Sequence, residues 1–338
     1  MQIQKKKLIG VDIGSAAVKA VRNTGGAQGW RFGWAPMPEG VLAGNQIQSP
    51  ALLGQAVKRA IADGRLGGGP VALTLSGNDV IIRHTTLPKM TPEQLRQNVI
   101  DEISGYLAVD PTLYTIDYKV QEVLQEGDAT QYRVMIVAVQ NSTLAAYVQA
   151  LKTAGLKVAS VDVSANAKEK LVNLLTGQPQ NCVVMDLGMQ GTTTDTYFQG
   201  RFYVNKISSI GLNTAVNSLA AALKTDTTTA WERLRAGDPS PETTAALGDY
   251  LEQMLFDSLR VIDYFRSRNG MATIDRVYLC GGGAAIPGIV SLIAERTGLA
   301  VEPLTQALSS FFGPGGSANP WLSGAAAAAG ATLTEVEG

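Results

Sequence analysis

The sequence predicts an α/β protein of two lobes that face a common cleft, with a small α+β module inserted between them. Three observations lead to this prediction. A chain of 338 residues exceeds the roughly 250–300 residues at which one hydrophobic core stops growing. A hydrophobic strand that ends in Asp-x-Gly and continues into a hairpin occurs at Asp12 and again at Asp186, which indicates a duplicated architecture. Between these copies, residues 80–154 have the pattern of a self-contained unit.

The first lobe is predicted to begin with three short strands joined by glycine turns, at the edge of a mixed sheet. Apolar residues at a helical spacing follow, and Gly64 ends that helix. The expected elements are strands over residues 8–13, 17–22 and 30–34, a helix over 51–63 and a strand over 71–75.

The inserted module is predicted as strand–helix–strand–strand–helix. Its first helix begins at a capping box, because Thr91 precedes Pro92 and is followed three residues later by Gln94. An apolar stripe on that helix is expected either to pack in the core or to form a groove for a partner peptide. The stripe consists of Leu95, Val99, Ile103, Tyr106 and Leu107, and the other elements are strands over 80–87, 114–123 and 132–139 and a helix over 142–154.

The rest of the chain returns to alternating strands and helices, because apolar runs bounded by glycine alternate with segments of helical period. Residues 225–241 are polar and are expected to be helical only in part. Strands are expected over 158–163, 183–187, 193–198, 202–207 and 277–280, and helices over 165–175, 212–223, 247–268 and 289–297.

Composition argues against several classes of function. The 28 Lys and Arg residues balance 29 Asp and Glu, so a broad nucleic-acid-binding face is not expected. One histidine is too few for a multi-histidine metal centre, and we expect His84 to be an exposed or hydrogen-bonded residue of a strand. Two cysteines make no disulfide framework, so Cys182 and Cys280 are expected to be small buried hydrophobes in a reducing compartment.

The chain is also expected to be soluble, with no membrane anchor or direct membrane insertion. The first apolar run ends at Asp12 and is too short for a secretory signal. The most apolar tract elsewhere, residues 325–329, is far shorter than the ~20 residues that cross a bilayer. We therefore expect a cytoplasmic protein.

The two Asp-x-Gly turns have the chemistry of a phosphate and magnesium site. Backbone N–H groups of a glycine turn bind phosphate oxygens, and one or two aspartates hold a hydrated Mg²⁺. Lys19 returns on the first hairpin with a charge for the phosphates, and Gly281, Gly282 and Gly283 form a third glycine cluster between a strand and a helix. The Walker A pattern is absent.

These motifs together resemble those of a known superfamily. Asp12-Ile13-Gly14-Ser15-x-x-x-Lys19 is similar to the first phosphate loop of actin-like ATPases, Asp186-x-Gly188 with Thr192 to the second, and residues 279–288 to the adenosine loop. Within that superfamily nearly the whole chain resembles the PilM family of type IV pilus assembly. The segments that carry this closer resemblance are 87–95, 161–163 and 258–260.

The resemblance implies a two-lobed actin/Hsp70-like ATPase fold with an inserted subdomain of the FtsA/PilM type. Residues 1–79 and 155–180, rejoined by about 315–338, would form the first lobe. Residues 80–154 would be the inserted, partner-binding subdomain, and residues 181–314 the second lobe.

It also implies ATP and Mg²⁺ between the lobes, with Asp12 and Asp186 holding the metal through water. Asp162 is the candidate for activating a water molecule, but Met189 and Gln190 enlarge the second loop, so binding is implied more firmly than hydrolysis. The residues implied for the phosphates are Gly14, Ser15, Lys19, Gly188 and Thr192, and those implied for the adenosine are Arg260, Gly281, Gly282 and Gly283.

The implied function is that of an ATP-binding cytoplasmic scaffold that binds the N-terminal cytoplasmic tail of a PilN-like inner-membrane protein. Such a protein lies at the inner membrane through its partner, and self-association is left open. Two alternatives remain. A small-molecule kinase of this fold needs a carboxylate base, and residues 163–168 contain none. A filament protein of the FtsA type needs a terminal amphipathic helix, and residues 331–338 contain no lysine or arginine.

Overall fold

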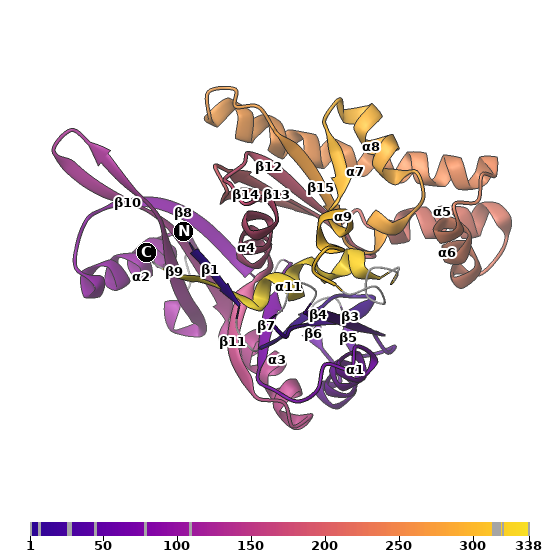
Figure 1. Cartoon of the computed structure of the whole chain (residues 1–338), viewed down its shortest axis with the longest axis horizontal. Coiled ribbons are helices and arrows are strands. Elements are labelled where there is room, and N and C mark those ends of the chain that lie inside the picture. The colour runs from indigo at the N-terminus through magenta and orange to yellow at the C-terminus, as the bar shows by residue number, and fades with distance from the viewer. Residues whose placement is uncertain are drawn as a thin grey trace.

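The computed structural model describes residues 2–5, 8–25, 29–43, 46–77, 80–107, 110–312, 319 and 321–336. Residues 315–318, 320, 337 and 338 of the predicted return to the first lobe lie outside the described residues. Two lobes, each built on a five-stranded sheet, lie one above the other in Figure 1, and a separate three-stranded sheet lies to one side.

The first-lobe sheet has the strand order β11-β7-β2-β3-β4. Its strands β2 and β7 run parallel, while β2, β3 and β4 form an antiparallel meander at one edge. This meander confirms the predicted arrangement. The strand bounds are Ile9–Ile13 (β2), Ala17–Asn23 (β3), Trp30–Pro36 (β4), Val71–Leu75 (β7) and Val158–Val163 (β11), and the first helix is Pro50–Asp63 (α1).

The second-lobe sheet has the order β14-β13-β12-β15-β16 and repeats this layout. Strand β12 pairs parallel with β15 and antiparallel with β13, as β2 pairs with β7 and β3. The duplication predicted from the two Asp-x-Gly turns is confirmed. The strands are Cys182–Leu187 (β12), Thr192–Phe198 (β13), Arg201–Ser208 (β14), Arg276–Cys280 (β15) and Val301–Pro303 (β16).

Helices cover the second-lobe sheet, and their apolar residues form its core with the inner faces of β12 and β15. The predicted partial helix in 225–241 is α6, which Asp226 caps by accepting a hydrogen bond from the Thr229 backbone. The helices are Leu212–Leu223 (α5), Thr227–Ala236 (α6), Pro241–Arg268 (α7), Ile289–Thr297 (α8) and Leu304–Leu308 (α9).

Two helices, Ser164–Thr176 (α4) and Ala326–Ala331 (α11), lie between the two sheets in Figure 1. They approach so closely that a Cβ at Gly330 would lie 1.9 Å from the Ala167 carbonyl oxygen. Small residues therefore allow this contact, and the short alanine run of α11 is buried throughout. Their apolar side chains join residues of both sheets in one shared core, so the lobes are packed against each other.

The inserted sheet has the order β8-β10-β9, and α2 covers one face of it. The predicted capping box is present, since the Thr91 backbone donates to Gln94 Oε1 and the Gln94 backbone donates to Thr91 Oγ1. The elements are Val80–Pro88 (β8), Pro92–Leu107 (α2), Pro111–Leu113 (η1), Tyr114–Glu126 (β9) and Ala129–Gln140 (β10).

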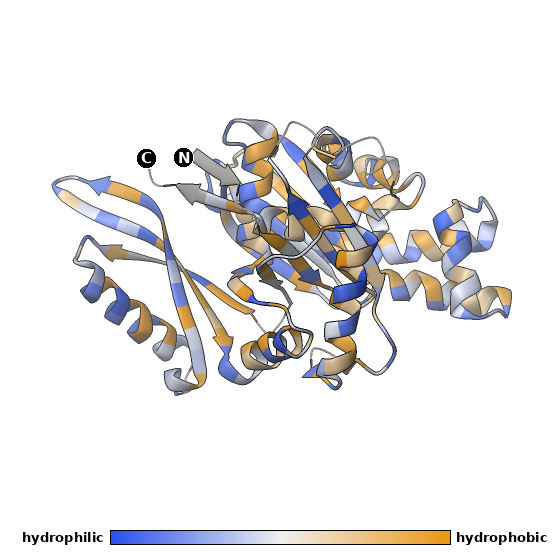
Figure 2. Cartoon of the chain, turned by 60° about the horizontal axis from the view of Figure 1, so that its bottom comes forward, coloured by the Kyte–Doolittle hydropathy of each residue, from blue (hydrophilic) through white to orange (hydrophobic). Residues whose placement is uncertain are grey.

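The apolar stripe of α2 is buried only in part. Leu95, Val99 and Ile103 pack on the sheet, as expected for a core face. Tyr106 is 57 % exposed, and the guanidinium of Arg83 lies 4.2 Å from its ring centroid. Figure 2 shows that this helix carries both hydrophilic and hydrophobic residues.

Helix α3 (Asn141–Thr153) packs mainly on the first lobe and touches the inserted sheet only to a lesser extent. It lies beside α1, and Ala150 and Leu151 are buried in the first-lobe core. The predicted module ends at residue 154, so this packing favours a boundary nearer Gln140. The division of the chain into three units stays a prediction.

Pairing of the two chain ends was not predicted. Strand β1 (Gln2–Lys5) pairs antiparallel with β17 (Leu333–Val336), which places the ends side by side in Figure 1. Two further short strands, Leu42–Ala43 (β5) and Gln46–Ile47 (β6), pair with each other. Among the described residues, no helix is both long enough and apolar enough to cross a bilayer.

Burial shifts the pKa values of the two cysteines and of the histidine. Cys182 and Cys280 are free and buried, as predicted, and burial raises the pKa of both thiols. His84 lies on a strand, β8, as predicted, but it is not exposed. Its ring is largely covered, its Nε2 has no hydrogen-bond partner among the described residues, and burial together with the charge of Arg133 lowers its pKa to about 4.

The capping box gives a test of the local structure. Replacing Thr91 with alanine removes the side chain that binds the Gln94 backbone, and we expect the free energy of unfolding to fall by about 1 kcal/mol. Urea denaturation followed by circular dichroism measures this change. Ser142→Ala is the matched control, since Ser142 is an exposed hydroxyl in the first turn of α3. Equal losses in the two variants would show that the cap contributes nothing.

Candidate functional site

A cavity of about 340 Å³ lies between the two lobes. Both Asp-x-Gly turns reach it, because β2 and β12 end at the same crevice from opposite sides. Asp12 and Gly14 line it from the first lobe, and Asp186 and Gly188 line it from the second. The two acidic turns therefore face one space, as the duplicated sequence pattern predicts.

Asp12 is held in place by two hydrogen bonds. Lys19 stands opposite it in the β2–β3 register, and its Nζ lies 3.0 Å from Asp12 Oδ2. The Thr74 hydroxyl donates to Asp12 Oδ1 at 3.1 Å. Burial alone would lower the pKa of Lys19, but the carboxylates of Asp12 and Asp186 outweigh it and raise that pKa. Lys19 therefore brings a fixed positive charge to the cavity.

Glycine in the first turn lets this lysine pass close to it. A Cβ at Gly14 would lie 2.6 Å from Lys19 Nζ, too near for the ammonium to keep its place beside Asp12. Gly281 approaches the second turn in the same way. Its φ is +83°, and a Cβ there would lie 2.4 Å from Asp186 Oδ1.

A second cation reaches the cavity from α4. Lys168 Nζ lies 2.6 Å from Asp195 Oδ2 and 3.6 Å from Asp186 Oδ2, and both Lys168 and Asp195 line the cavity. The lysine is 1 % exposed. Burial opposes its charge, but Asp195 and Asp186 together raise its pKa, so the ammonium stays protonated.

Sequence reasoning missed Lys168 and Asp195. Lys168 is the first of three consecutive charged residues on a predicted helix, and such a run normally marks the solvated face. Asp195 interrupts a run of threonines on β13, and a buried aspartate within a strand was the available signal. Its pairing with a lysine 27 positions away in the sequence comes only from the tertiary fold.

The structure brings most of the predicted site residues together. The residues predicted from sequence that line the cavity are Asp12, Gly14, Ser15, Lys19, Asp186, Gly188, Gly281 and Gly282. Thr192 and Gly283 lie beneath the surface instead. The Thr192 hydroxyl donates to the Ile210 carbonyl at 2.9 Å, and Gly283 packs against Leu187 and Leu212.

Arg260 and Asp162 lie elsewhere, and neither is among the described residues that line the cavity. Arg260 is exposed on α7, over the ring of Phe256. The Asp162 carboxylate accepts hydrogen bonds from Lys170 Nζ at 2.6 Å and from Asn166 at 2.9 Å. This placement argues against the predicted adenosine contact of Arg260 and the predicted water activation by Asp162.

The charged groups suit a hydrated cation better than a fully protein-bound one. Within the described residues, no three His, Cys, Asp or Glu side chains gather as a metal site. Asp12 and Asp186 present carboxylates to the cavity from opposite lobes. Mg²⁺ keeps several waters and takes one or two carboxylates, so this donor set fits it.

Comparison with known proteins identifies the family. The family model described as type IV pilus assembly protein PilM matches residues 10–309. The chain belongs to the PilM family.

Solved structures agree on the fold. A structure titled "PilM-PilN type IV pilus biogenesis complex" is similar, with a TM-score of 0.82, 23 % identity, and coverage of 97 % of this chain and 98 % of that chain. The ethanolamine utilization protein EutJ from Carboxydothermus hydrogenoformans gives a TM-score of 0.57 at 15 % identity, covering 93 % and 91 %. MreB 5 of Spiroplasma citri bound to AMPPNP gives 0.51 at 13 %, covering 91 % and 94 %. The PilM family member described here thus has an α/β actin-like fold.

The buried pair of Lys168 and Asp195 gives a prediction about stability and pH. Lys168→Met leaves Asp195 buried without its cation, and we expect a loss of about 3–5 kcal/mol at pH 8. Burial then raises the pKa of Asp195 in the folded variant above its unfolded value, so the variant loses stability as pH rises through that pKa. Urea denaturation at pH 5.5 and pH 8 measures both effects.

The double variant Lys168→Met with Asp195→Asn is the control, because it removes the uncompensated charge. We expect it to recover part of the loss at pH 8. If Lys168→Met unfolds at the wild-type urea concentration at both pH values, the pair does not stabilise the fold.

Proposed function

We propose that this protein is an ATP-binding assembly scaffold of a type IV pilus machine. In this proposal the nucleotide holds the two lobes together, and the inserted module binds a partner protein of the membrane. The carrying observation is the interlobe cavity, where an Asp-x-Gly turn reaches in from each lobe and the ammonium groups of Lys19 and Lys168 lie beside the two aspartates. A ligand that binds across this cavity contacts both lobes and therefore holds them in one relative position.

A nucleoside triphosphate suits the chemistry of the cavity. The N–H groups of Gly14 and Gly188 close their own turns by donating to the carbonyls of Ala17 and Gly191 at 3.0 Å. Phosphate oxygens would therefore bind the other backbone N–H groups of these two turns. Lys19 and Lys168 supply two ammonium groups within reach of the same space. The AMPPNP complex of MreB 5, which shares the fold, supports an adenine nucleotide as the ligand. Bound Mg²⁺ would neutralise phosphate charge between Asp12 and Asp186.

The residues favour binding over rapid hydrolysis. Attack by water on a phosphate needs a group that orients or deprotonates that water. Asp162 is occupied by Lys170 and Asn166, and Asp195 is paired with Lys168. We therefore propose that the nucleotide acts mainly as a clamp.

The partner is proposed to be the cytoplasmic N-terminal tail of a PilN-like inner-membrane protein, which would hold the scaffold at the cytoplasmic face of that membrane. The similar PilM–PilN complex supports this partner. The inserted sheet also exposes apolar side chains that a short peptide would cover, with Val120 37 % exposed and Val123 57 % exposed on β9.

The nucleotide proposal predicts a loss of affinity in a lysine variant. Lys19→Met removes one charge-assisted hydrogen bond to phosphate, about 1.5–3 kcal/mol, so ATP should bind about ten- to a hundredfold more weakly. Isothermal titration calorimetry with ATP and Mg²⁺ measures this. Lys58→Met, on the exposed face of α1, is the matched control. An unchanged dissociation constant for Lys19→Met would refute the placement of the phosphates.

The partner proposal predicts nucleotide-dependent capture of a peptide. A synthetic peptide with the sequence of a PilN-like N-terminal tail, immobilised on beads, should retain the full-length protein, and more of it when ATP and Mg²⁺ are present. A peptide of the same composition in scrambled order is the control. Equal retention by both peptides would contradict the proposed partner.

A further inference from the structure

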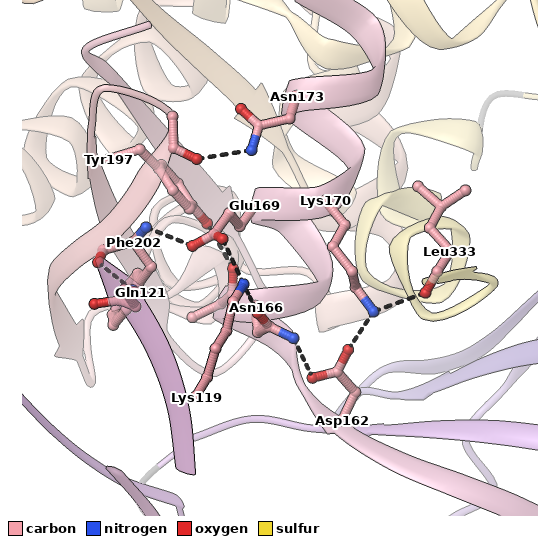
Figure 3. A network of polar contacts seen from close by, with 12 residues as sticks. Lys119, Gln121, Asp162, Asn166, Glu169, Lys170, Asn173, Tyr197, Phe202 and Leu333 are labelled. Atoms are coloured by element: carbon pink, nitrogen blue, oxygen red, sulfur yellow. Dashed lines mark hydrogen bonds and ion pairs between the residues drawn. The ribbon is translucent and has the colours of Figure 1, made fainter. Parts of the chain in front are cut away.

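Helix α4 carries three consecutive charged residues that are all buried. Lys168 and Glu169 are each 1 % exposed, and Lys170 is 7 % exposed. Successive residues of a helix point about 100° apart, so the three side chains leave the axis in three directions. Figure 3 shows Glu169 and Lys170 reaching different parts of the molecule.

Each of the three charges pairs with a different unit. Lys168 meets Asp195 of the second lobe in the cavity. Glu169 meets Lys119 of the inserted sheet at 2.7 Å. Lys170 meets Asp162 of first-lobe strand β11 at 2.6 Å and donates to the Leu333 carbonyl of β17.

Glu169 also joins the inserted sheet to the second lobe. One carboxylate oxygen binds Lys119 on β9, and the other accepts a hydrogen bond from the Phe202 backbone at the start of β14. Beside it, Gln121 Nε2 of β9 donates to the Phe202 carbonyl at 2.9 Å. Both backbone groups of Phe202 are thus held at this junction, one by α4 and one by the inserted sheet (Figure 3).

Further side-chain contacts join the inserted sheet to the neighbouring residues of β14. Arg201 forms an ion pair with Glu122 of β9 at 3.2 Å. The ring of His84 on β8 lies 5.5 Å from the ring of Phe202. The guanidinium of Arg133 on β10 lies 5.2 Å from the Tyr203 ring centroid. All three strands of the inserted sheet therefore contact the first residues of β14.

The same strands and helix also line the cavity. Asp195 on β13 pairs directly with Asn205 on β14, and both residues line it. Phe202 is three positions before Asn205, and Glu169 directly follows Lys168. The groups around the cavity and the groups at the junction are thus parts of one hairpin and one helix.

We propose that Glu169 is a positioning residue that couples the cavity to the docking of the inserted sheet on β14. This inference rests on the proposed binding of nucleotide. The inserted sheet is attached to the first lobe at both ends, through β7 before it and α3 after it, whereas β14 belongs to the second lobe. A ligand that draws the lobes together therefore favours docking, and docking in turn strengthens ligand binding by the same factor.

His84 reports the docked state. It is the one histidine of the sequence, so ¹³C-labelled histidine gives a single NMR signal. Burial and the charge of Arg133 lower its pKa to about 4, and the Phe202 ring of the docked strand covers one side of it. Arg133 is in turn paired with Glu122, which also pairs with Arg201 of β14. An undocked ring returns toward its ordinary pKa of 6.5, so undocking takes up a proton and becomes more favourable as pH falls below 6.5.

The first experiment needs no substitution. The His84 signal is followed from pH 7.5 to about pH 3.5 in the full-length protein, without ligand and with ATP and Mg²⁺, and calorimetry shows that the nucleotide is saturating. We expect the nucleotide to shift the titration midpoint downward. If ATP saturates the protein and the midpoint does not move, the coupling is refuted. If ATP does not bind, the proposed function fails first and the coupling falls with it.

The second experiment removes the charge of Glu169. We expect Glu169→Gln to raise the His84 midpoint, to shrink its response to ATP, and to weaken ATP binding by about fivefold or more, although Glu169 lies outside the cavity. Glu252→Gln on the exposed face of α7 is the matched control and should change none of these. A merely structural role would lower the unfolding midpoint in urea and leave the response of His84 to ATP intact, which would overturn the proposal.

A milder variant covers the case in which Glu169→Gln does not fold. Arg201 is 42 % exposed at the side chain, so Arg201→Gln weakens the junction without leaving a buried charge. We expect smaller changes in the same directions. Wild-type values for both the His84 midpoint and the ATP affinity in Arg201→Gln would contradict the proposal.

Discussion

Pairing of buried charges on α4 is the constraint on which the arrangement of this molecule depends. An isolated ion in a protein interior costs several kcal/mol, so Lys168, Glu169 and Lys170 are tolerated only where each has its counter-charge. Their partners lie in the second lobe, the inserted sheet and the first lobe. Hydrophobic contacts between the lobes tolerate small slides, whereas three ion pairs in three directions fix one position of the helix among the three units.

The close packing around α4 follows from small residues rather than from large ones. The alanines of α11 and Gly330 let that helix approach α4 until backbone atoms are in contact. Gly10 on β2 does the same on the other side, since a Cβ there would lie 1.8 Å from the Ala328 carbonyl oxygen. The same two helices contribute to the core shared by both sheets, and Lys168 and Lys19 reach one cavity beside it.

Much of the fold was predictable because its signals are local. The periodic spacing of hydrophobic residues predicted the strands and helices, and turn residues predicted the hairpins. The pair Thr91 and Gln94 predicted where α2 begins. The two Asp-x-Gly turns also predicted a shared crevice, because a duplicated unit brings equivalent strand ends together. The failures are non-local. Lys168, Asp195 and the burial of His84 depend on contacts between units distant in sequence. Arg260 lies away from the cavity on the exposed face of α7, and its adenosine contact came from the resemblance and not from the pattern of that helix.

The charge balance of the cavity explains why a metal ion belongs with the nucleotide. Three carboxylates, those of Asp12, Asp186 and Asp195, face two ammonium groups, those of Lys19 and Lys168. One negative charge is left over before any ligand enters. A triphosphate adds several more negative charges in a space where water screens poorly, so the two lysines alone cannot offset them. In the proposed complex a divalent cation would supply the missing positive charge, and Asp12 and Asp186 are the carboxylates that would hold it through water. Because these two carboxylates come from opposite lobes, a cation held by both would favour an arrangement in which the lobes stay close together.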